Sequence, residues 1–102
     1  PNLNKIKELE GLIVAVTAHA DQEDFDCISR VFAPKLGIPE DPVTGSTHCM
    51  ITPYWCHRLR KQELICFQAS ERSGILSTKL CGERVKVAGQ AVLFSKGTIL
   101  ED

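Results

Sequence analysis

The sequence predicts an α+β fold in which a twisted, mostly antiparallel sheet is curled around one central buried helix. Residues 42 to about 59 carry no formal charge before Arg58, and a helix that is neutral all round is typically buried rather than at the surface. Residues 12–18 form a short apolar run rich in β-branched side chains, as in a strand buried on both faces. After Lys61 the apolar side chains recur with a period of two, which indicates strands.

The N-terminal part divides into four segments with distinct patterns. They are an amphipathic helix, an apolar strand, a second strand that follows an acidic turn, and a loop interrupted by Pro and Gly. These segments cover residues 2–10, 12–18, 25–32 and 33–41.

The flanks of the central segment suit a helix. The turn-rich residues 41–46 precede it, and the cations Arg58, Arg60 and Lys61 close it, where they interact favourably with the helix dipole. Pro53 lies inside the segment and predicts a kink or a restarted turn there.

Four antiparallel strands are predicted after this helix, over residues 63–69, 75–81, 84–88 and 91–95. Gly82 and Glu83 separate the second and third of them. Glycine at the first central position suits a two-residue type II′ hairpin. Ser73 and Gly74 mark another turn.

The composition is that of one globular domain covering residues 1–102. Of its 102 residues 43% are apolar and 25% are charged, and a chain of this size buries roughly two thirds of its unfolded surface. A formal net charge of −1 provides no attraction to nucleic acid or to an anionic membrane. The longest uncharged run contains His, Thr, Ser and Pro, which argues against a membrane span.

The five cysteines form no C-x-x-C pair, and their number is odd. This pattern predicts reduced thiols that pack as small apolar side chains. Because the sequence shows no secretion signal, a cytoplasmic protein is expected. The chain begins with Pro1 rather than Met, which predicts processing or a cut from a longer protein.

The start of the central helix is a candidate anion site. The first N–H groups of a helix lack internal partners, and with the helix dipole they attract a carboxylate or a phosphate. Gly45 lets a ligand approach the backbone closely, and Ser46 and Thr44 add hydroxyl groups. Asp41 lies just upstream, where its carboxylate could orient an amine or hydroxyl of the same ligand.

A purely structural interpretation of the same residues stays open. Asp41 followed by Pro42 is an ordinary helix opening, with Asp as the N-cap and Pro at the first helical position. Thr44 or Ser46 could serve as the cap instead.

Three stretches together resemble the PhzF-like isomerases of the phenazine-biosynthesis protein family. Residues 30–34 (RVFAP) are similar to the family's R-x-F-A-P stretch, and residues 41–46 (DPVTGS) to its D-P-x-T-G-S signature. Residues 67–74 (FQASERSG) resemble its Q-G/A-x-x-x-G segment. The resemblance runs from about residue 12 to residue 98.

The resemblance implies a fold like that of diaminopimelate epimerase. Such proteins have two similar domains, each a sheet curled round a central helix, with the active site in the cleft between them. This chain would correspond to most of the C-terminal domain. The family's acid/base Glu and an assisting His belong to the first domain and have no counterpart here.

The resemblance also implies roles for the candidate residues. Asp41 matches an active-site aspartate that contacts the substrate's amine or hydroxyl, and Gly45 and Ser46 match carboxylate-binding positions. Thr47 stands where many relatives have Ala, which would affect substrate choice. The implied reaction is a proton transfer within a small carboxylate-bearing metabolite, such as a dihydro-hydroxyanthranilate in biosynthesis, without metal or cofactor.

Three other interpretations remain. Residues 48, 49, 56 and 57 are His, Cys, Cys and His, but structural zinc ligands usually come in closer pairs. A two-cysteine epimerase needs a Cys at the helix start, whereas Cys49 lies a turn further in and is expected to face the interior, where a thiol is inert. The third interpretation is a catalytically silent binding or interaction module.

An unpaired sheet edge is expected because relatives have further strands before the position of Pro1. Such an edge favours association. The expected partner is therefore a second copy of the chain or the missing N-terminal domain, in addition to the small carboxylate ligand.

Overall fold

The computed structural model describes residues 1–101, which form three helices and six strands. In chain order these are α1 (Leu3–Lys7), β1 (Val14–His19), β2 (Cys27–Ala33), the 3-10 helix η1 (Pro34–Leu36), β3 (Ile38–Asp41), α2 (His48–Leu59), β4 (Glu63–Gln68), β5 (Gly74–Cys81) and β6 (Arg84–Ala88). The mixture of one sheet with packed helices confirms the predicted α+β class.

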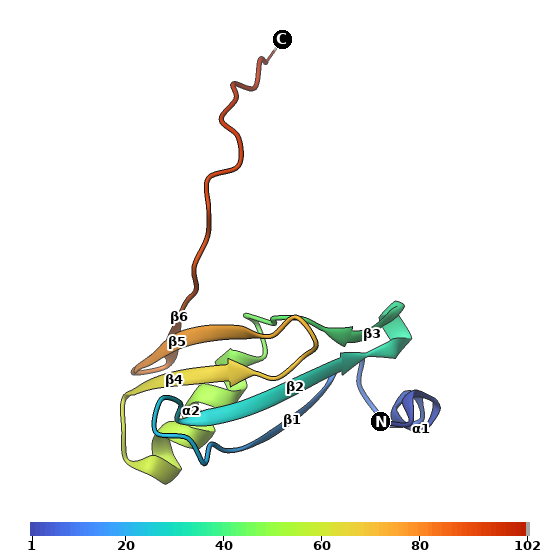
Figure 1. Cartoon of the computed structure of the whole chain (residues 1–102), viewed down its shortest axis with the longest axis vertical. Coiled ribbons are helices and arrows are strands. Elements are labelled where there is room, and N and C mark those ends of the chain that lie inside the picture. Colours follow the sequence, from blue (N-terminus) through green and yellow to red (C-terminus); the bar gives the residue numbers. More distant parts are fainter. Residues whose placement is uncertain (102) are drawn as a thin grey trace.

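The sheet is mostly antiparallel, as predicted. Its strand order is β1-β2-β4-β5-β6, and β3 pairs with the part of β2 that β4 leaves free. Only β2 and β4 run parallel, with Cys27 opposite Cys66 and Ser29 opposite Gln68. The parallel pair arises because α2 is the crossover between the N-terminal strands and β4 (Figure 1).

Helix α2 packs against one face of this sheet and fills the core. Its buried residues recur at intervals of three and four, which gives the apolar stripe that a packed helix needs. Trp55 donates a hydrogen bond from Nε1 to Oγ1 of Thr17 in β1, over 2.9 Å. Val87 of β6, at the other end of the strand order, also packs against the core. Since α2 reaches both end strands, the sheet bends around the helix.

The helix starts later than the sequence predicted. Residues 42–47 form a loop and a turn, and α2 begins at His48. The carbonyl of Asp41, which would accept the N–H of Gly45 in a helix that starts at residue 42, instead accepts a hydrogen bond from Nε2 of Gln68. The helix then continues through Pro53 without a break. The carbonyl that Pro53 leaves without its helical donor belongs to Cys49, which is exposed.

Two segments are less buried than their composition predicted. The side of α2 that carries Met50 and Tyr54 is open, with exposed fractions of 70% and 47%. Strand β1 has five exposed residues out of six because it lies at the edge of the sheet. The prediction of burial on all sides was therefore wrong for both segments in this chain.

The predicted loop at residues 33–41 contains regular structure. After η1, strand β3 pairs with β2 through Val31 opposite Asp41 and Ala33 opposite Ile38. Pro39 is tolerated because β3 bonds to a neighbour on one side only. Gly37 has a φ of 80° between η1 and β3, a conformation that favours glycine.

The C-terminal part confirms three of the four predicted strands. The hairpin between β5 and β6 turns at Gly82, whose φ is 60°, and pairs Cys81 with Arg84. The predicted strand at residues 91–95 is wrong, because residues 89–101 carry no regular structure and extend away from the body (Figure 1). Among residues 1–101, no helix is both long and apolar enough to cross a bilayer.

Candidate functional site

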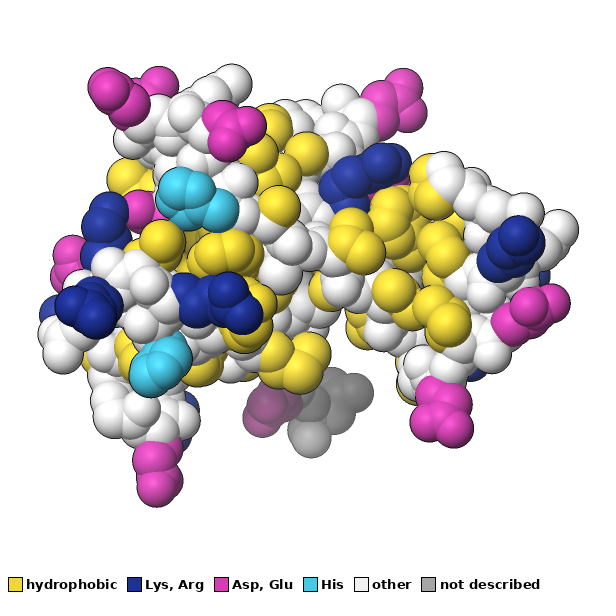
Figure 2. Space-filling view, turned by 90° about the horizontal axis from the view of Figure 1, so that it is seen from below, with side chains coloured by type: hydrophobic (Ala, Val, Ile, Leu, Met, Phe, Trp, Pro, Cys, Tyr) yellow, Lys and Arg dark blue, Asp and Glu magenta, His cyan; other side chains and the backbone are white. Residues whose placement is uncertain are grey.

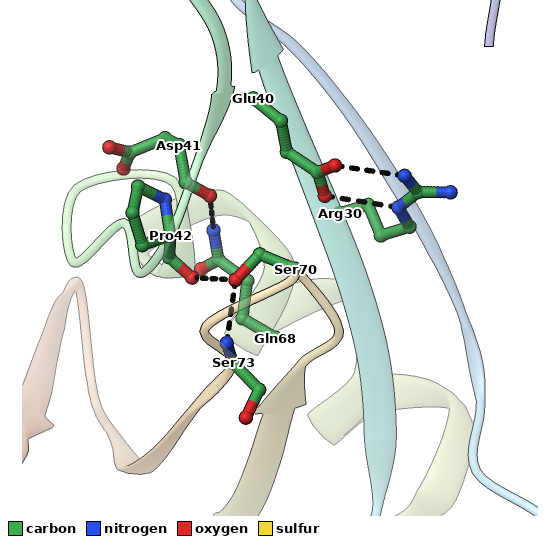
Figure 3. A network of polar contacts seen from close by, with 7 residues as sticks. All are labelled: Arg30, Glu40, Asp41, Pro42, Gln68, Ser70 and Ser73. Atoms are coloured by element: carbon green, nitrogen blue, oxygen red, sulfur yellow. Dashed lines mark hydrogen bonds and ion pairs between the residues drawn. The ribbon is translucent and has the colours of Figure 1, made fainter.

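The loop between β3 and α2 contains the candidate residues, and one buried side chain holds it. Gln68, at the end of β4, is fully buried. Its Oε1 accepts the N–H of Thr44 at 2.8 Å, and its Nε2 donates to the carbonyl of Asp41 at 3.0 Å and to Oγ1 of Thr44 at 3.1 Å. A single amide therefore determines the backbone course of this loop, as Figure 3 shows for its Asp41 contact.

The turn between β4 and β5 provides a second anchor. Oγ of Ser70 donates to the carbonyl of Pro42 at 2.7 Å and accepts the N–H of Ser73 at 2.9 Å (Figure 3). Next to it, Val43 packs so closely on Gly74 that a Cβ at Gly74 would lie 2.2 Å from Cγ2 of Val43. The loop is thus clamped through both hydrogen bonds and close packing.

The turn that opens α2 leaves three backbone donors free. The carbonyls of Gly45 and Ser46 accept the N–H groups of His48 and Cys49 at 3.0 and 3.1 Å, which makes a tight first turn. Within residues 1–101 the N–H groups of Gly45, Ser46 and Thr47 have no hydrogen-bond partner. Because they lie at the N-terminal end of a 12-residue helix, these donors can hold an anion.

Asp41 is fixed beside this turn by Thr44, whose hydroxyl donates to the Asp41 carboxylate. Figure 3 shows that the carboxylate points away from Gln68. The interpretation of Asp41 as the helix N-cap was wrong, because the N-cap is Thr47, six residues further on. Thr44 and Ser46 do not cap α2 either: Thr47 holds that position without a capping bond, and its Oγ1 donates to the carbonyl of Thr44 at 3.1 Å.

The side chain of His48 contacts the backbone of the turn that precedes α2. This side chain is fully buried, and burial lowers the pKa of His48, which favours the neutral ring. Nδ1 lies 2.7 Å from the carbonyl of Thr44, which can only accept, so Nδ1 carries the proton. His48 is therefore a hydrogen-bonding group behind the loop of residues 41–47.

Glu40, which precedes Asp41, is neutralised by a bidentate ion pair. Nε and Nη2 of Arg30 donate to Oε2 and Oε1 of Glu40 at 3.0 and 2.8 Å (Figure 3). These hydrogen bonds hold the pKa of Glu40 below its usual value. The Glu40 carboxylate therefore links β3 to β2 through Arg30. Asp41 is then the carboxylate of this pair that has no ion-pair partner in the described part of the chain and can contact a ligand.

The cysteines and histidines do not assemble into a metal site. Among the described residues, no three side chains of His, Cys, Asp or Glu converge. His48 and Cys56 are buried, whereas Cys49 and His57 are exposed on the other side of the helix. The expectation that Cys49 faces the interior was wrong, because the face of α2 that carries it is uncovered.

Two buried cysteines from neighbouring strands do meet. Sγ of Cys27 donates to Sγ of Cys66 over 3.4 Å. This hydrogen bond and burial both raise the pKa of Cys27. Both thiols belong to the packed core, as the composition suggested.

The structure thus brings together Asp41, Thr44, Gly45, Ser46 and Thr47 on one loop. Sequence reasoning did not assign Gln68, Ser70 and Gly74 to the site, although they are the residues that shape it. The available signal is the F-Q-A-S-E-R-S-G stretch, which predicts a strand end and a turn and resembles a family segment, but does not by itself show contact with residues 41–44. Gly45 and Ser46 are exposed, so the site is an open surface rather than an enclosed pocket.

Comparisons with known proteins agree with one another. The family described as phenazine biosynthesis-like protein (PhzC-PhzF) matches residues 1–97. An uncharacterized isomerase from Pseudomonas aeruginosa is 48% identical over 99 residues, covering 97% of this chain and 37% of that protein. A solved PhzF-family protein from Enterococcus faecalis has a TM-score of 0.85 and 43% identity, covering 93% of this chain and 36% of the other. The solved structure of a PhzC/PhzF protein from Clostridium difficile has a TM-score of 0.83 and 42% identity, and the match covers 97% of this chain and 38% of that protein. The chain therefore spans little more than a third of these relatives.

Proposed function

Since the chain belongs to the phenazine biosynthesis-like (PhzC/PhzF) family, we propose that it is the substrate-binding half of a cofactor-independent isomerase for a small carboxylate-bearing metabolite. The observation that carries this proposal is the row of three unpartnered N–H groups at Gly45, Ser46 and Thr47, with Asp41 upstream on the same clamped loop. Such donors suit a carboxylate because they need no rearrangement on binding.

In this proposal the ligand carboxylate accepts hydrogen bonds from the three N–H groups and from the Ser46 hydroxyl, and the dipole of α2 adds attraction. Asp41 contacts an amine or a hydroxyl of the same ligand. The hydroxyl of Thr44 already has two protein partners, Asp41 and Gln68, so its part is to orient Asp41. Thr47 is buried beside the donors and limits the space there.

The proton-transferring Glu in this proposal comes from a domain outside these residues, and this chain corresponds to the C-terminal half of a diaminopimelate-epimerase-like fold. Two features support it. The relatives are long enough to include a second domain, since 36–38% of each is matched. The open helix start also needs a covering surface to exclude water, which strengthens charge interactions in an active site.

A second candidate function is a binding module without turnover. It is favoured by the ion pair between Arg30 and Glu40. Glu40 is the residue next to Asp41, and the ion pair lowers the pKa of the Glu40 carboxyl. A carboxylate held in this way is a weaker base, so the 102-residue chain alone would bind a ligand without isomerising it.

Amide-resolved NMR titration with small aromatic and aliphatic carboxylates tests the proposal. Saturable shifts at Gly45, Ser46 and Thr47 are expected, and Ser46→Ala should weaken binding by about three- to tenfold, the loss of one hydrogen bond. Ser95→Ala, in the exposed C-terminal segment, is the control and should change nothing. If millimolar carboxylates shift none of the three amides, the helix start is only a turn and the proposal fails.

A further inference from the structure

Two buried thiols meet in the core of this chain and have no part in the proposed binding site. Cys27 in β2 and Cys66 in β4 are 0% and 1% exposed, and their sulfur atoms lie 3.4 Å apart. They pack in one cluster with Ile51, Trp55 and Cys56 of α2. Both strands and the helix belong to this chain, so the burial of the pair does not depend on residues outside it.

The backbone geometry of the pair suits a covalent link. Cys27 and Cys66 are directly opposite each other in the parallel ladder between β2 and β4. Neighbouring strands lie about 4.8 Å apart, and a disulfide usually joins Cα atoms about 4.4–6.8 Å apart. To reach a bond length of about 2.05 Å, the sulfur atoms must approach by roughly 1.4 Å, a displacement that is shared between two side chains.

Cys66 is the more nucleophilic of the two thiols. It accepts the hydrogen bond from Cys27, which holds the pKa of Cys66 below its usual value, although burial acts in the opposite direction. Oγ1 of Thr78 lies 3.9 Å from the same sulfur atom. Cys27, as the donor of the bond, keeps its proton until Cys66 has reacted. One thiol is therefore prepared to attack an oxidant, and the other lies in place to complete a disulfide.

The surroundings of the pair favour a small, neutral oxidant. The core around it is apolar and includes Leu64, Leu76 and Trp55. Figure 2 looks onto the lower side of Figure 1, where β1 is the lowest strand, and shows hydrophobic side chains over much of the surface with acidic groups mainly at the margins. An ion is costly to bring into such a core, whereas hydrogen peroxide is uncharged and little larger than water.

We propose that Cys27 and Cys66 are a redox-active pair, which a peroxide closes to an intramolecular disulfide. The sulfur of Cys66 attacks one oxygen of hydrogen peroxide, the O–O bond breaks, and the leaving hydroxide takes up the proton of Cys66 to become water. The sulfur of Cys27 then attacks the sulfur of the Cys66 sulfenic acid, the S–O bond breaks, and the hydroxide that leaves takes up the proton of Cys27 as a second water. The two thiols lose two electrons, and the peroxide gains them.

The disulfide acts on the anchor of the loop that precedes α2. Gln68 follows Cys66 by two residues on the same face of β4, and its opposite residue, Ser29, follows Cys27 by two residues in β2. Drawing the two strands together at the sulfur atoms therefore displaces Gln68, to which the N–H of Thr44 donates. This effect on the loop does not depend on whether the loop binds a ligand.

Peptide mapping after treatment with hydrogen peroxide tests the disulfide in the 102-residue chain. Free thiols are alkylated, and trypsin then releases Cys27 in residues 8–30 and Cys66 in residues 62–72, while the other three cysteines lie in other peptides. A link between these two peptides is expected, and dithiothreitol should break it. Mixing isotope-labelled and unlabelled chains should show that the link lies within one chain. The absence of this link, a link between chains, or links from either peptide to Cys56 alone would overturn the proposal.

Two alanine variants of buried cysteines provide a matched comparison. Cys66→Ala should abolish the link. Cys56→Ala changes a cysteine of the same core cluster, 3% exposed, and should leave the link intact. The map of the unsubstituted chain stays decisive where a variant fails to fold.

Amide NMR of a Cys49→Ser chain, which lacks the exposed thiol in the first turn of α2, measures the effect on the loop. On oxidation the N–H of Thr44 and the side-chain amide of Gln68 should shift, and dithiothreitol should restore both signals. The amide of Ser95, in the exposed C-terminal segment, is the control and should not shift. A mapped disulfide that leaves the Thr44 amide unshifted would contradict the effect on the loop.

Discussion

The side-chain amide of Gln68 holds Thr44 by two hydrogen bonds, accepting its N–H at 2.8 Å and donating to its hydroxyl at 3.1 Å. The same amide donates to the carbonyl of Asp41 at 3.0 Å, which a helix starting at residue 42 would need as the acceptor for Gly45, so α2 begins only at His48 and the N–H groups of residues 45–47 stay free. The geometry of the candidate site therefore depends on a residue that lies outside the signature loop.

Gln68→Leu should destabilise the fold and impair the loop. The substitution leaves the N–H of Thr44 and the carbonyl of Asp41 without partners in a buried setting, which costs about 2–4 kcal/mol for the two groups together. Urea unfolding measures the loss. Gln62→Leu, at an exposed glutamine, is the control and should change stability by less than about 0.5 kcal/mol. Equal losses of unfolding free energy in both variants would show that Gln68 does not hold the loop.

Gly74→Ala should be destabilising by about 1–3 kcal/mol, because the new methyl group would overlap Val43. Val43→Ala in the same chain should recover part of the loss, since it removes the overlapping Cγ2. Gly97→Ala is the control because nothing lies near the position of its Cβ. Thermal unfolding of the two single variants, the double variant and Gly97→Ala measures these effects. Additive changes in stability for Gly74→Ala and Val43→Ala would contradict the contact between the two residues.

Stability should fall on mild acidification because of His48. Its pKa is lowered by burial in the folded chain, so the unfolded chain binds more protons in the window just below the ordinary pKa of about 6.5. The free energy of unfolding is therefore highest above pH 6.5 and decreases as the pH falls through that window. The carboxyls whose pKa is lowered, Asp26 and Glu40, act only at more acidic pH, below their ordinary values.

Urea unfolding at pH 5 to 8 checks this, with His48→Asn as the test variant, since an asparagine amide can replace Nδ1 as a donor to Thr44. The variant should lose most of the slope between pH 5 and 6.5. His57→Asn, at an exposed position, should keep it. A slope that survives in His48→Asn would assign it to another group.

Asp41→Asn should change which carboxylates bind rather than whether they bind. Loss of the negative charge removes attraction to an amine on the ligand, so α-amino acids should bind about threefold to thirtyfold more weakly, while simple carboxylates bind unchanged or more tightly. Glu71→Gln, which removes an exposed charge from the neighbouring turn, controls for net charge. The NMR titration described above measures both ligand classes. An equal effect of Asp41→Asn on both classes would contradict the assigned contact.

The order and type of most elements followed from local sequence. The apolar run before His19, the period of two after Lys61 and the glycine at the β5–β6 turn each carry their own structural signal. Strand β3 and the unpaired segment after Ala88 were not predictable in this way. The first contains Pro39 and directly follows Gly37, so its sequence resembles a loop, and the second has a strand sequence but no neighbour among the described residues to pair with.

The sequence by itself determined the α+β class, the family motifs and the loop of residues 41–47 as the place to seek a ligand. Only the tertiary structure decided where α2 begins and which donors remain free. It also decided that the neutral helix and the apolar strand β1 stay partly open. The physical reason is that hydrogen bonds such as those of Gln68, and the burial of a strand, depend on groups distant in sequence, which no local pattern specifies.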